Sequence, residues 1–584
     1  YSATKVVTWD TTPPTVTLET MARPATLPAG DPTQPTSWVK DEVAYVRLTV
    51  MDASRNPLAT DVTTMGFNGS PMEAAGNCGA CMAPACICVG VDLKDAPLAA
   101  LRGMVPVRVA AGAFVDVVGN QSLAQMADFN VTRVKWQRAA GAGEYRAAPV
   151  LDAKGNLYVG SIDNLPGTAG RVVSLQPADG GVRWTATTGA VQALAAATSA
   201  TETGGQLDVV YVTSNEDNAT VRAGRLRGLS ALDGGTAGLH SSICQSGTRP
   251  MYSAPALVLV GGSTSTNTQN IGALGLFNTA LVVDGNACGY SPSTGNSNAT
   301  TAASAKYSLP AVPTPAESAV NLVSTGTTHY SVNSDFSVES WAWSMGVPPA
   351  STANLPRGGV GPTQTGLTVV ETSLLTSQTR DNPREPFGLL GNTLMNVSYS
   401  TATSGFTRAG PAVALTGASS GGALVVAGAN DGASGVWLRQ QQVAAATTAA
   451  PMFSGTPMIP AGLPPTNESL PTSPVYGDAN QVYLVTRAGR LYVLTATPTG
   501  LTYAWDALLP SVAGEVLAHP TLDCNRQRGT TAPGVFYAVS TQGTVTAIVV
   551  DSRRLGVAPW PKWQRTAGNA GNSSSDFALN PGCN

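Results

Sequence analysis

The eight cysteines are the residues of this chain whose spacing says most about its chemistry. Four lie in one short stretch, NCGACMAPACIC, and four are scattered over the rest of the sequence. In order they are Cys78, Cys81, Cys86, Cys88, Cys244, Cys288, Cys524 and Cys583. An even count in a chain with little charge favours disulfide bonds and an oxidising compartment.

Cys86 and Cys88 are two residues apart on an expected strand, so their side chains point to one face. We expect each to bond Cys78 or Cys81, and the spacing leaves the connectivity open. A four-thiolate zinc site is the alternative, but its ligands usually come from two separated C-x2-4-C elements. For the other four we expect the bonds Cys244–Cys288 and Cys524–Cys583, each within nearby repeats or at one closure.

Other chemistry is poorly supplied. The chain has 3 histidines, His240, His329 and His519, and none is spaced as a metal-binding pair. Nucleophile-elbow, zinc-protease and phosphate-loop motifs do not occur. Asn215–Asn218 and Asp284–Asn286 are weak candidates for a structural Ca²⁺ site, and we interpret both as turns. Trp341 and Trp343 share a strand face and are weak ligand-binding candidates, although packing between repeats explains them as well.

The elements that would position these residues are short strands in repeated meanders. Ala148–Trp184 contains four expected strands: Ala148–Leu151, Asn156–Ser161, Arg171–Leu175 and Val182–Thr185. Their turns are rich in Gly, Asp and Asn, which tolerate left-handed backbone angles. Copies occur at Ser473–Trp505, His519–Val550 and Pro411–Leu438. A single meander cannot bury both faces, so the copies must stack.

A proline opens most of the repeats. The aligned prolines are Pro149, Pro255, Pro310, Pro362, Pro411, Pro474 and Pro520. The long gap after Pro149 holds one further copy, with Asp208–Thr213 and Gly224–Leu229 as its strands. The sequence therefore predicts eight units of roughly 50 residues, as in an eight-bladed β-propeller, with seven blades as the alternative. Lys135–Gly141 is expected to supply the outer strand of the last blade and close the ring.

Composition agrees with an all-β chain. Of 584 residues, 62 are Gly and 41 are Pro, and charged residues make up 12%, about half the usual share. The net charge of −3 provides no electrostatic footprint for nucleic acid. No apolar run approaches the roughly 20 residues that span a bilayer, and no signal peptide is visible.

The repeats resemble the pyrroloquinoline-quinone-like (PQQ-like) repeat family, most clearly at APVLDAKGNLYVGS, GRVVSLQPADGGVRW, SPVYGDANQVYLVTRAGRLYVL and PWPKWQRTAGNAGN. That family includes quinone- and calcium-dependent alcohol dehydrogenases and non-catalytic scaffolds. The dehydrogenases carry adjacent cysteines against the cofactor, and this chain has no Cys-Cys dipeptide. Their Ala-x-Asp-x-x-x-Gly-x-x-x-Trp docking motif is only echoed, at Ala178–Trp184 and Ala231–Gly235. The resemblance therefore implies a propeller without bound quinone.

Residues 10–135 resemble the bacterial Ig-like domains strung in tandem in surface proteins. The matching phrases are DTTPPTVT at Asp10–Thr17 and AAGAFVDVVGN at Ala110–Asn120. Five expected strands are Thr15–Leu18, Val43–Met51, Ile87–Leu93, Val105–Ala110 and Phe129–Val134. Residues 1–9 then look like the last strand of a preceding domain or a linker, and the chain looks like part of a longer protein.

The predicted architecture is an Ig-like β-sandwich (residues 10–135) followed by a PQQ-like propeller (residues 136–584). We expect a non-catalytic binding, adhesion or assembly protein, extracellular or on a bacterial cell surface, without a cofactor. Its expected partner is a protein or a polysaccharide, bound by the Ser/Thr/Asn-rich loops of blades three to five, about residues 252–410. The alternative is an enzyme, either a quinoprotein oxidoreductase or a polysaccharide-active hydrolase or lyase.

Overall fold

The computed structural model describes most of residues 10–235 and 470–583, and mainly strand backbones between them. The described residues are 10–28, 30–51, 58–59, 62–63, 78–79, 81, 86–116, 118–163, 169–200, 206–218, 221–235, 244–245, 251, 254–259, 271–277, 286–290, 297–301, 322–325, 328–332, 338–344, 347–355, 367–370, 373–377, 387–390, 397–398, 412–415, 423–431, 435–443, 453–458, 470–497, 500–510, 512–529, 531–558, 561–562, 564–570 and 578–583. Their extended elements are all β-strands, and they include no helix long and apolar enough to cross a membrane. The chain divides into two units, Tyr1–Gln137 and Arg138–Asn584.

The first unit is built from two facing sheets and a short strand pair. One sheet has the order β1-β3-β6, the other β2-β9-β7-β5, and β4 pairs with β8. The strands are β1 (Thr15–Thr20), β2 (Trp38–Val39), β3 (Val43–Met51), β4 (Leu58–Ala59), β5 (Val62–Thr63), β6 (Cys86–Asp92), β7 (Arg102–Val109), β8 (Phe114–Val115) and β9 (Gln125–Thr132).

Alternation along the strands places apolar side chains between the two sheets. In β3, Ala44, Val46, Leu48 and Val50 are buried while their neighbours are more exposed. They pack with Val105 and Val107 of β7 and with Phe129 and Val131 of β9 in one core cluster. A period of two with one buried face is what a sandwich requires of its strands.

The sequence interpretation was wrong about the end of this unit. Phe129–Val134 is not one strand, because β9 ends at Thr132 and β10 (Val134–Ala139) starts after Arg133. Arg133 is buried and its guanidinium group donates to the carbonyl oxygens of Leu98 and Ala100. This anchor holds the chain where β9 gives way to β10, four residues before the first unit ends at Gln137.

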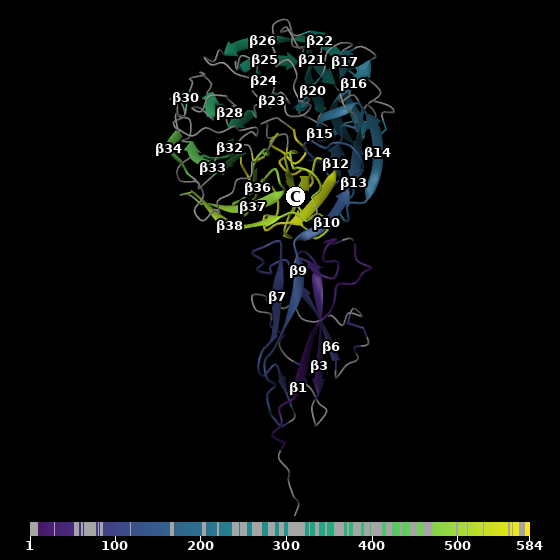
Figure 1. The fold of residues 1–584 in the computed structure, drawn as a ribbon, viewed down its shortest axis with the longest axis vertical. Helices are drawn as coiled ribbons and strands as arrows, with labels where there is room; N and C mark the ends of the chain where they lie inside the picture. The colour runs from purple at the N-terminus through teal and green to yellow at the C-terminus, as the bar shows by residue number, and fades with distance from the viewer. Residues whose placement is uncertain are drawn as a thin grey trace, which may run out of the picture. The chain divides into compact units, whose positions relative to one another are not determined.

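The second unit contains eight four-stranded antiparallel sheets among its described residues, and Figure 1 shows them following one another in chain order. We number them sheets 1 to 8. Sheets 1 to 4 are β11 (Val150–Leu151), β12 (Leu157–Gly160), β13 (Gly170–Leu175), β14 (Val182–Thr188); β15 (Ala190–Ala200), β16 (Gln206–Asn218), β17 (Val221–Ser230), β18 (Cys244–Gln245); β19 (Ala256–Leu259), β20 (Ile271–Phe277), β21 (Asn286–Tyr290), β22 (Ser297–Thr301); β23 (Leu322–Thr325), β24 (Thr328–Val332), β25 (Val338–Ser344) and β26 (Val347–Leu355).

Sheets 5 to 8 repeat the same order of strands. They are β27 (Leu367–Val370), β28 (Ser373–Ser377), β29 (Phe387–Leu390), β30 (Val397–Ser398); β31 (Ala412–Leu415), β32 (Ala423–Asp431), β33 (Gly435–Val443), β34 (Phe453–Met458); β35 (Val475–Tyr476), β36 (Gln481–Val485), β37 (Arg490–Thr497), β38 (Gly500–Leu508); and β39 (Thr521–Asp523), β40 (Val535–Val539), β41 (Thr544–Val549) with β10. In sheets 1 to 7 the four strands are consecutive. In sheet 8 the outer strand is β10, as the sequence predicts for Lys135–Gly141.

The first and last sheets are neighbours, so the series returns on itself. The backbone N–H of Tyr145, just before β11, donates to the carbonyl oxygen of Thr541, between β40 and β41, at 2.8 Å. On the other side, the N–H of Ser473 before β35 donates to Nδ1 of His519 before β39 at 2.9 Å. Sheet 8 therefore contacts both sheet 7 and sheet 1, as ring closure requires.

Candidate functional site

All six cysteines whose side chains the structure describes form disulfides. The bonds are Cys78–Cys88, Cys81–Cys86 and Cys524–Cys583. The first two resolve the connectivity that the spacing leaves open, with β6 carrying Cys86 and Cys88. Their sulfur atoms are thus bonded to each other rather than arranged as a four-thiolate zinc site.

Several predicted site residues lie where the structure gives strand positions only. Cys244 is in β18 of sheet 2 and Cys288 in β21 of sheet 3, and these two strands contact each other. Trp341 and Trp343 are in β25, with Trp341 opposite His329 of β24. These side chains lie outside the described residues, as do Asp284 and His240, so the Cys244–Cys288 bond and the tryptophan site stay predictions.

Asn215–Asn218 is not a turn, which corrects the sequence interpretation. It is the end of β16, which runs without interruption from Gln206 to Asn218. The guanidinium groups of Arg225 and Arg227, on the next strand, form ion pairs with the carboxylate of Glu216. Its oxygens therefore face cations of the protein itself.

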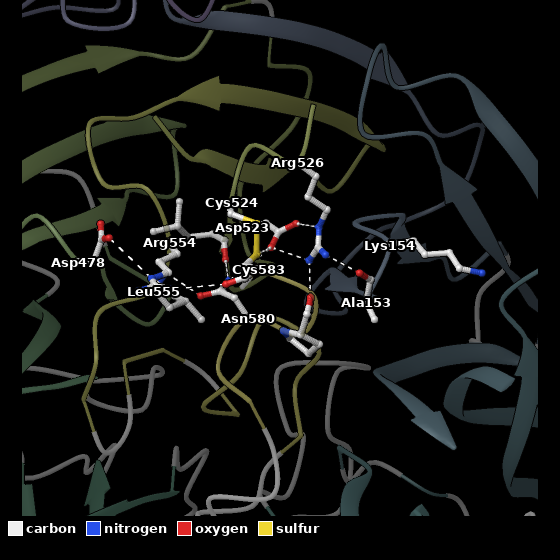
Figure 2. Close-up of a disulfide and its surroundings, with 12 residues drawn as sticks. Ala153, Lys154, Asp478, Asp523, Cys524, Arg526, Arg554, Leu555, Asn580 and Cys583 are labelled. Carbon is white, nitrogen blue, oxygen red and sulfur yellow. Dashed lines mark hydrogen bonds and ion pairs between the residues drawn. A yellow bond between two sulfur atoms is a disulfide. The ribbon is translucent and has the colours of Figure 1, made fainter. Parts of the chain in front are cut away.

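The Cys524–Cys583 bond belongs to a clamp that holds the C-terminal residues on sheet 8 (Figure 2). The Asn580 amide donates to the Leu522 carbonyl oxygen at 3.0 Å and accepts from the Leu555 N–H at 2.9 Å. The Arg526 guanidinium forms an ion pair with Asp523 at 2.9 Å and donates to the carbonyl oxygen of Pro581 at 2.6 Å. Burial raises the pKa of Asp523, and the Arg526 charge opposes that rise.

The same C-terminal segment, described at residues 558, 561–562, 564–570 and 578–583 and called the central segment below, crosses the first strands of several sheets. Carbonyl oxygens of the segment accept backbone N–H groups from β35, β11, β15 and β19. The pairs are Tyr476 with Pro561 at 2.7 Å, Leu151 with Ala567 at 3.1 Å, Ala196 with Gly568 at 2.8 Å and Leu257 with Ala570 at 2.8 Å. The side-chain amide of Asn580, also in this segment, donates to Leu522 of β39. The segment therefore bonds the first strands of sheets 7, 8, 1, 2 and 3. It therefore lies at the centre that these five sheets share.

Charged residues are buried in this central segment. Lys562 and Arg565 are 0% and 9% exposed. The Lys562 ammonium donates to the carbonyl oxygen of Thr566 at 3.1 Å and to the side-chain oxygen of Asn569. Burial lowers the pKa of Lys562 to about 7 and that of Arg565 to about 10. Burial, with the nearby Lys562, lowers the pKa of His519 to about 3, so this histidine is neutral at pH 7.

The backbone of the central segment takes a tight path. A Cβ on Gly568 would lie 2.6 Å from the carbonyl oxygen of Ala196 and 3.2 Å from that of Leu151. Gln564, Arg565 and Asn569 have φ values of 54°, 66° and 54°, a region that residues with a Cβ adopt at a cost. Such a path persists only where the surroundings determine it, which agrees with the burial of these residues.

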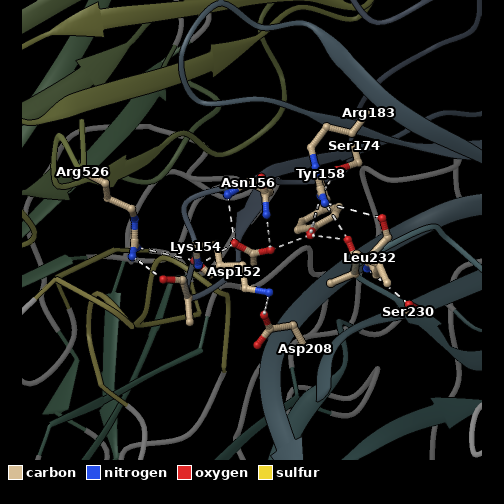
Figure 3. A network of polar contacts seen from close by, with 12 residues as sticks. Asp152, Lys154, Asn156, Tyr158, Ser174, Arg183, Asp208, Ser230, Leu232 and Arg526 are labelled. Carbon is tan, nitrogen blue, oxygen red and sulfur yellow. Dashed lines mark hydrogen bonds and ion pairs between the residues drawn. The ribbon is translucent and has the colours of Figure 1, made fainter. Parts of the chain in front are cut away.

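A second polar network ties sheet 1 to its neighbours (Figure 3). Tyr158 Oη donates to Asp152 at 2.6 Å, and Asp152 also accepts from the Asn156 N–H at 2.9 Å. Burial and the Asp152 charge raise the pKa of Tyr158 far above its ordinary value. From the same turn Lys154 reaches Asp208 of sheet 2 at 3.4 Å, while Ala153 accepts from Arg526 of sheet 8. This network fixes turns, and its tyrosine stays protonated.

Trp184 gives the echoed docking motif a structural role. Its indole N–H donates to the Ala231 carbonyl oxygen in the following sheet at 3.1 Å. A Cβ on Gly234 would lie 2.6 Å from the indole ring, so the glycine lets the turn pack against it. The motif thus joins sheet 1 to sheet 2.

Sequence reasoning missed the central segment itself. Lys562, Arg565 and Asn569 were not candidates, although PWPKWQRTAGNAGN was among the phrases that resemble the family. One signal was available in the sequence. The PWPKWQRTAGNAGN stretch, after the last predicted strand, shows no alternation of apolar and polar residues, yet it carries two cations in a chain with little charge. A segment that docks through backbone groups leaves no side-chain period to detect.

Comparisons with known proteins find similarity at the level of the fold. No family model and no curated protein matches the sequence. Among solved structures, the chain is similar to Sqt1 of Saccharomyces cerevisiae (TM-score 0.44, 11% identity, 72% of this chain and 99% of that one). It is also similar to BamB from Moraxella catarrhalis (0.39, 12%, 70% and 97%) and to the quinohemoprotein alcohol dehydrogenase ADHIIG from Pseudomonas putida (0.41, 10%, 74% and 78%). These structures are β-propellers, the class of fold that the closed series of sheets in the second unit also defines.

Proposed function

We propose that this chain is a non-catalytic, secreted or cell-surface binding or assembly protein. In this proposal an Ig-like stalk, residues 10–135, presents an eight-bladed PQQ-like propeller, residues 136–584, whose blades are sheets 1 to 8. The propeller has no resident cofactor, and its partner is a protein or a surface polysaccharide. Three disulfides support an oxidising compartment.

One observation carries the proposal: the chain's own C-terminal segment occupies the centre shared by sheets 7, 8, 1, 2 and 3. A propeller encloses a central channel in which a cofactor or small substrate could be held. Here Lys562, Thr566, Ala567 and Asn569 are buried there and bonded to the protein itself. A ligand would have to displace residues that a disulfide and five strands hold. Recognition by the loops outside the centre needs no such displacement.

The loops between about residues 252 and 410, with Trp341 and Trp343, are the proposed contact surface. The test uses the purified chain, surface polysaccharides and a cell-surface protein fraction, with binding and turnover measured on the same samples. We expect saturable binding without turnover. The dissociation constant of the Trp341→Ala/Trp343→Ala variant should be at least tenfold higher than that of the wild type. The matched control is Trp184→Phe, since Trp184 joins two sheets outside these loops.

The enzyme alternative is tested on the same preparation with added quinone, Ca²⁺ and a panel of alcohols, and with the polysaccharides as substrates. Alcohol oxidation or chain cleavage that follows the purified protein would overturn the proposal. Equal binding by the tryptophan variant and by the wild type would leave binding intact but remove these loops as the contact surface.

A further inference from the structure

The seam between sheets 1 and 2 contains a buried polar corner that the proposed function does not use. Glu216 of β16 bonds Arg225 Nη2 at 2.9 Å through one carboxylate oxygen and Arg227 through the other. In the strand register Ser214 lies opposite Arg225, and Arg227 lies two residues further along the same strand. Since side chains alternate along strands, these four residues share one face of sheet 2.

That face is covered by sheet 1. Val210 and Val212 precede Ser214 on the same side of β16, and they pack with Val172 and Tyr158 of sheet 1 in one cluster. A Cβ on Gly189 would lie 2.5 Å from Glu216 Cγ, so the connection between the sheets runs against this carboxylate. The Arg227 side chain is 9% exposed, and those of Arg225 and Glu216 are each 23% exposed. The corner is therefore largely, though not completely, closed to solvent.

Hydrogen-bonding groups in this corner are left over. Nε of Arg225, Nε of Arg227 and Oγ of Ser214 are buried and have no partner among the described residues. An arginine Nε–H can only donate, so both nitrogens require an acceptor. Native proteins rarely leave buried donors unpaired. Two guanidinium groups against one carboxylate also leave one positive charge in this group of three. A water molecule would accept the hydrogen bonds but would not balance the charge.

We propose that this corner binds a small monovalent anion, either a halide ion or a single carboxylate group, between Arg225, Arg227 and Ser214. The two Nε–H groups and the serine hydroxyl donate to the anion, while Glu216 binds Nη2 of both guanidinium groups. Charge-assisted hydrogen bonds of this type are stronger than those between neutral groups. Because the anion joins β16 and β17 beneath sheet 1, its binding stabilises the second unit.

The experiment measures thermal unfolding of the full chain while sodium bromide or sodium acetate replaces sodium sulfate at constant ionic strength. We expect a saturable rise of about 3 °C at one hundred times the dissociation constant of the anion. The Arg227→Gln and Ser214→Ala variants should show at least a tenfold higher half-saturating concentration. Ser214→Ala keeps every charge and adds no volume, so it tests the site even if Arg227→Gln folds poorly. The control is Arg171→Gln, which removes a different arginine–aspartate pair in sheet 1.

Crystals soaked in bromide give the position of the ion. An anomalous peak within hydrogen-bonding distance of both Nε atoms, together with the stability effect, supports the proposal. Stabilisation by acetate but not by bromide identifies a carboxylate site, and the reverse identifies a halide site. Equal salt dependence in the wild type and the Ser214→Ala variant overturns the proposal. A peak without any effect on stability means an adventitious ion only, and it overturns the proposal as well.

Discussion

The close approach of Gly568 to two sheets makes it the sharpest test of the central segment. In the Gly568→Ala variant the new Cβ would lie 2.6 Å from the Ala196 carbonyl oxygen and 3.2 Å from that of Leu151. Both neighbours are backbone atoms of first strands, so the segment must move away. Overpacking of this kind costs about 1–3 kcal/mol. Weakening the 2.8 Å and 3.1 Å hydrogen bonds to Ala196 and Leu151 adds about 0.5–1.5 kcal/mol each.

The free energy of unfolding should therefore fall by about 2–6 kcal/mol. For a unit of about 450 residues this lowers Tm by about 2–6 °C, at roughly 2.1 cal/mol/K per residue. Scanning calorimetry measures it. Trypsin offers a second readout, because Lys562 and Arg565 are buried in the wild type and become cleavable once the segment leaves. Gly529→Ala is the control: its φ is +85° with nothing within 4 Å of an added Cβ, so it should cost only about 1 kcal/mol. Equal Tm shifts and equal trypsin resistance in both variants would refute a docked central segment.

Three further predictions concern contacts around this segment and between sheets 1 and 2. Replacing both Cys524 and Cys583 by Ser removes a bond that spans 59 residues, so unfolding should become easier by about 4 kcal/mol; urea titration checks this, and a change below about 1 kcal/mol would contradict it. The pKa of His519 is lowered to about 3, below its unfolded value, so the unfolded state gains the proton first as pH falls. Stability should be full above about pH 6.5 and decline towards pH 3 by at most about 1.4 kcal/mol per pH unit, a slope that His519→Asn should reduce. Trp184→Phe loses the hydrogen bond to Ala231 and should destabilise by about 1 kcal/mol in the same titration; no loss would mean that ring packing alone joins sheets 1 and 2.

The strong repeats could be predicted because their strands carry local signals. Val150–Leu151, Leu157–Gly160, Gly170–Leu175 and Val182–Thr188 lie within or next to the predicted strands. Turns such as Asp152–Asn156 can be predicted because Asp and Asn side chains accept hydrogen bonds from nearby backbone N–H groups. In the structure Asp152 accepts from the N–H groups of Lys154 and Asn156. A strand with one buried face and a turn at each end has a restricted pattern of residues, so its position can be predicted from the sequence.

The remaining features depend on contacts between distant residues. The residues next to Asn215–Asn218 do not indicate that Glu216 forms ion pairs with Arg225 and Arg227 of the paired strand. Without these partners, a run of polar residues is typical of a turn. Cys86 and Cys88 share a face, but their partners follow from how the 78–81 stretch returns to β6. The central segment is the extreme case. Its carbonyl groups bond four strands, and a carbonyl group is the same in every residue.

Sheet 8 is where both closures of the ring meet, and this makes their coupling measurable. Its outer strand is β10, which comes before sheet 1 in the chain, and its first strand β39 ends beside Cys524, to which Cys583 is bonded. The disulfide holds the far end of the segment, while Gly568 lets its middle lie against sheets 1 and 2.

Either change alone, Gly568→Ala or loss of the Cys524–Cys583 bond, should favour the same released state. Once the segment has left, the second change has less to remove. We therefore expect the combined variant to lose less stability than the two single losses together, by more than about 0.5 kcal/mol, the scatter expected for independent sites. Urea titrations of the four proteins in the cycle measure this difference. Strict additivity would show that the clamp and the middle of the segment are docked independently, and that the centre is filled by two separate contacts.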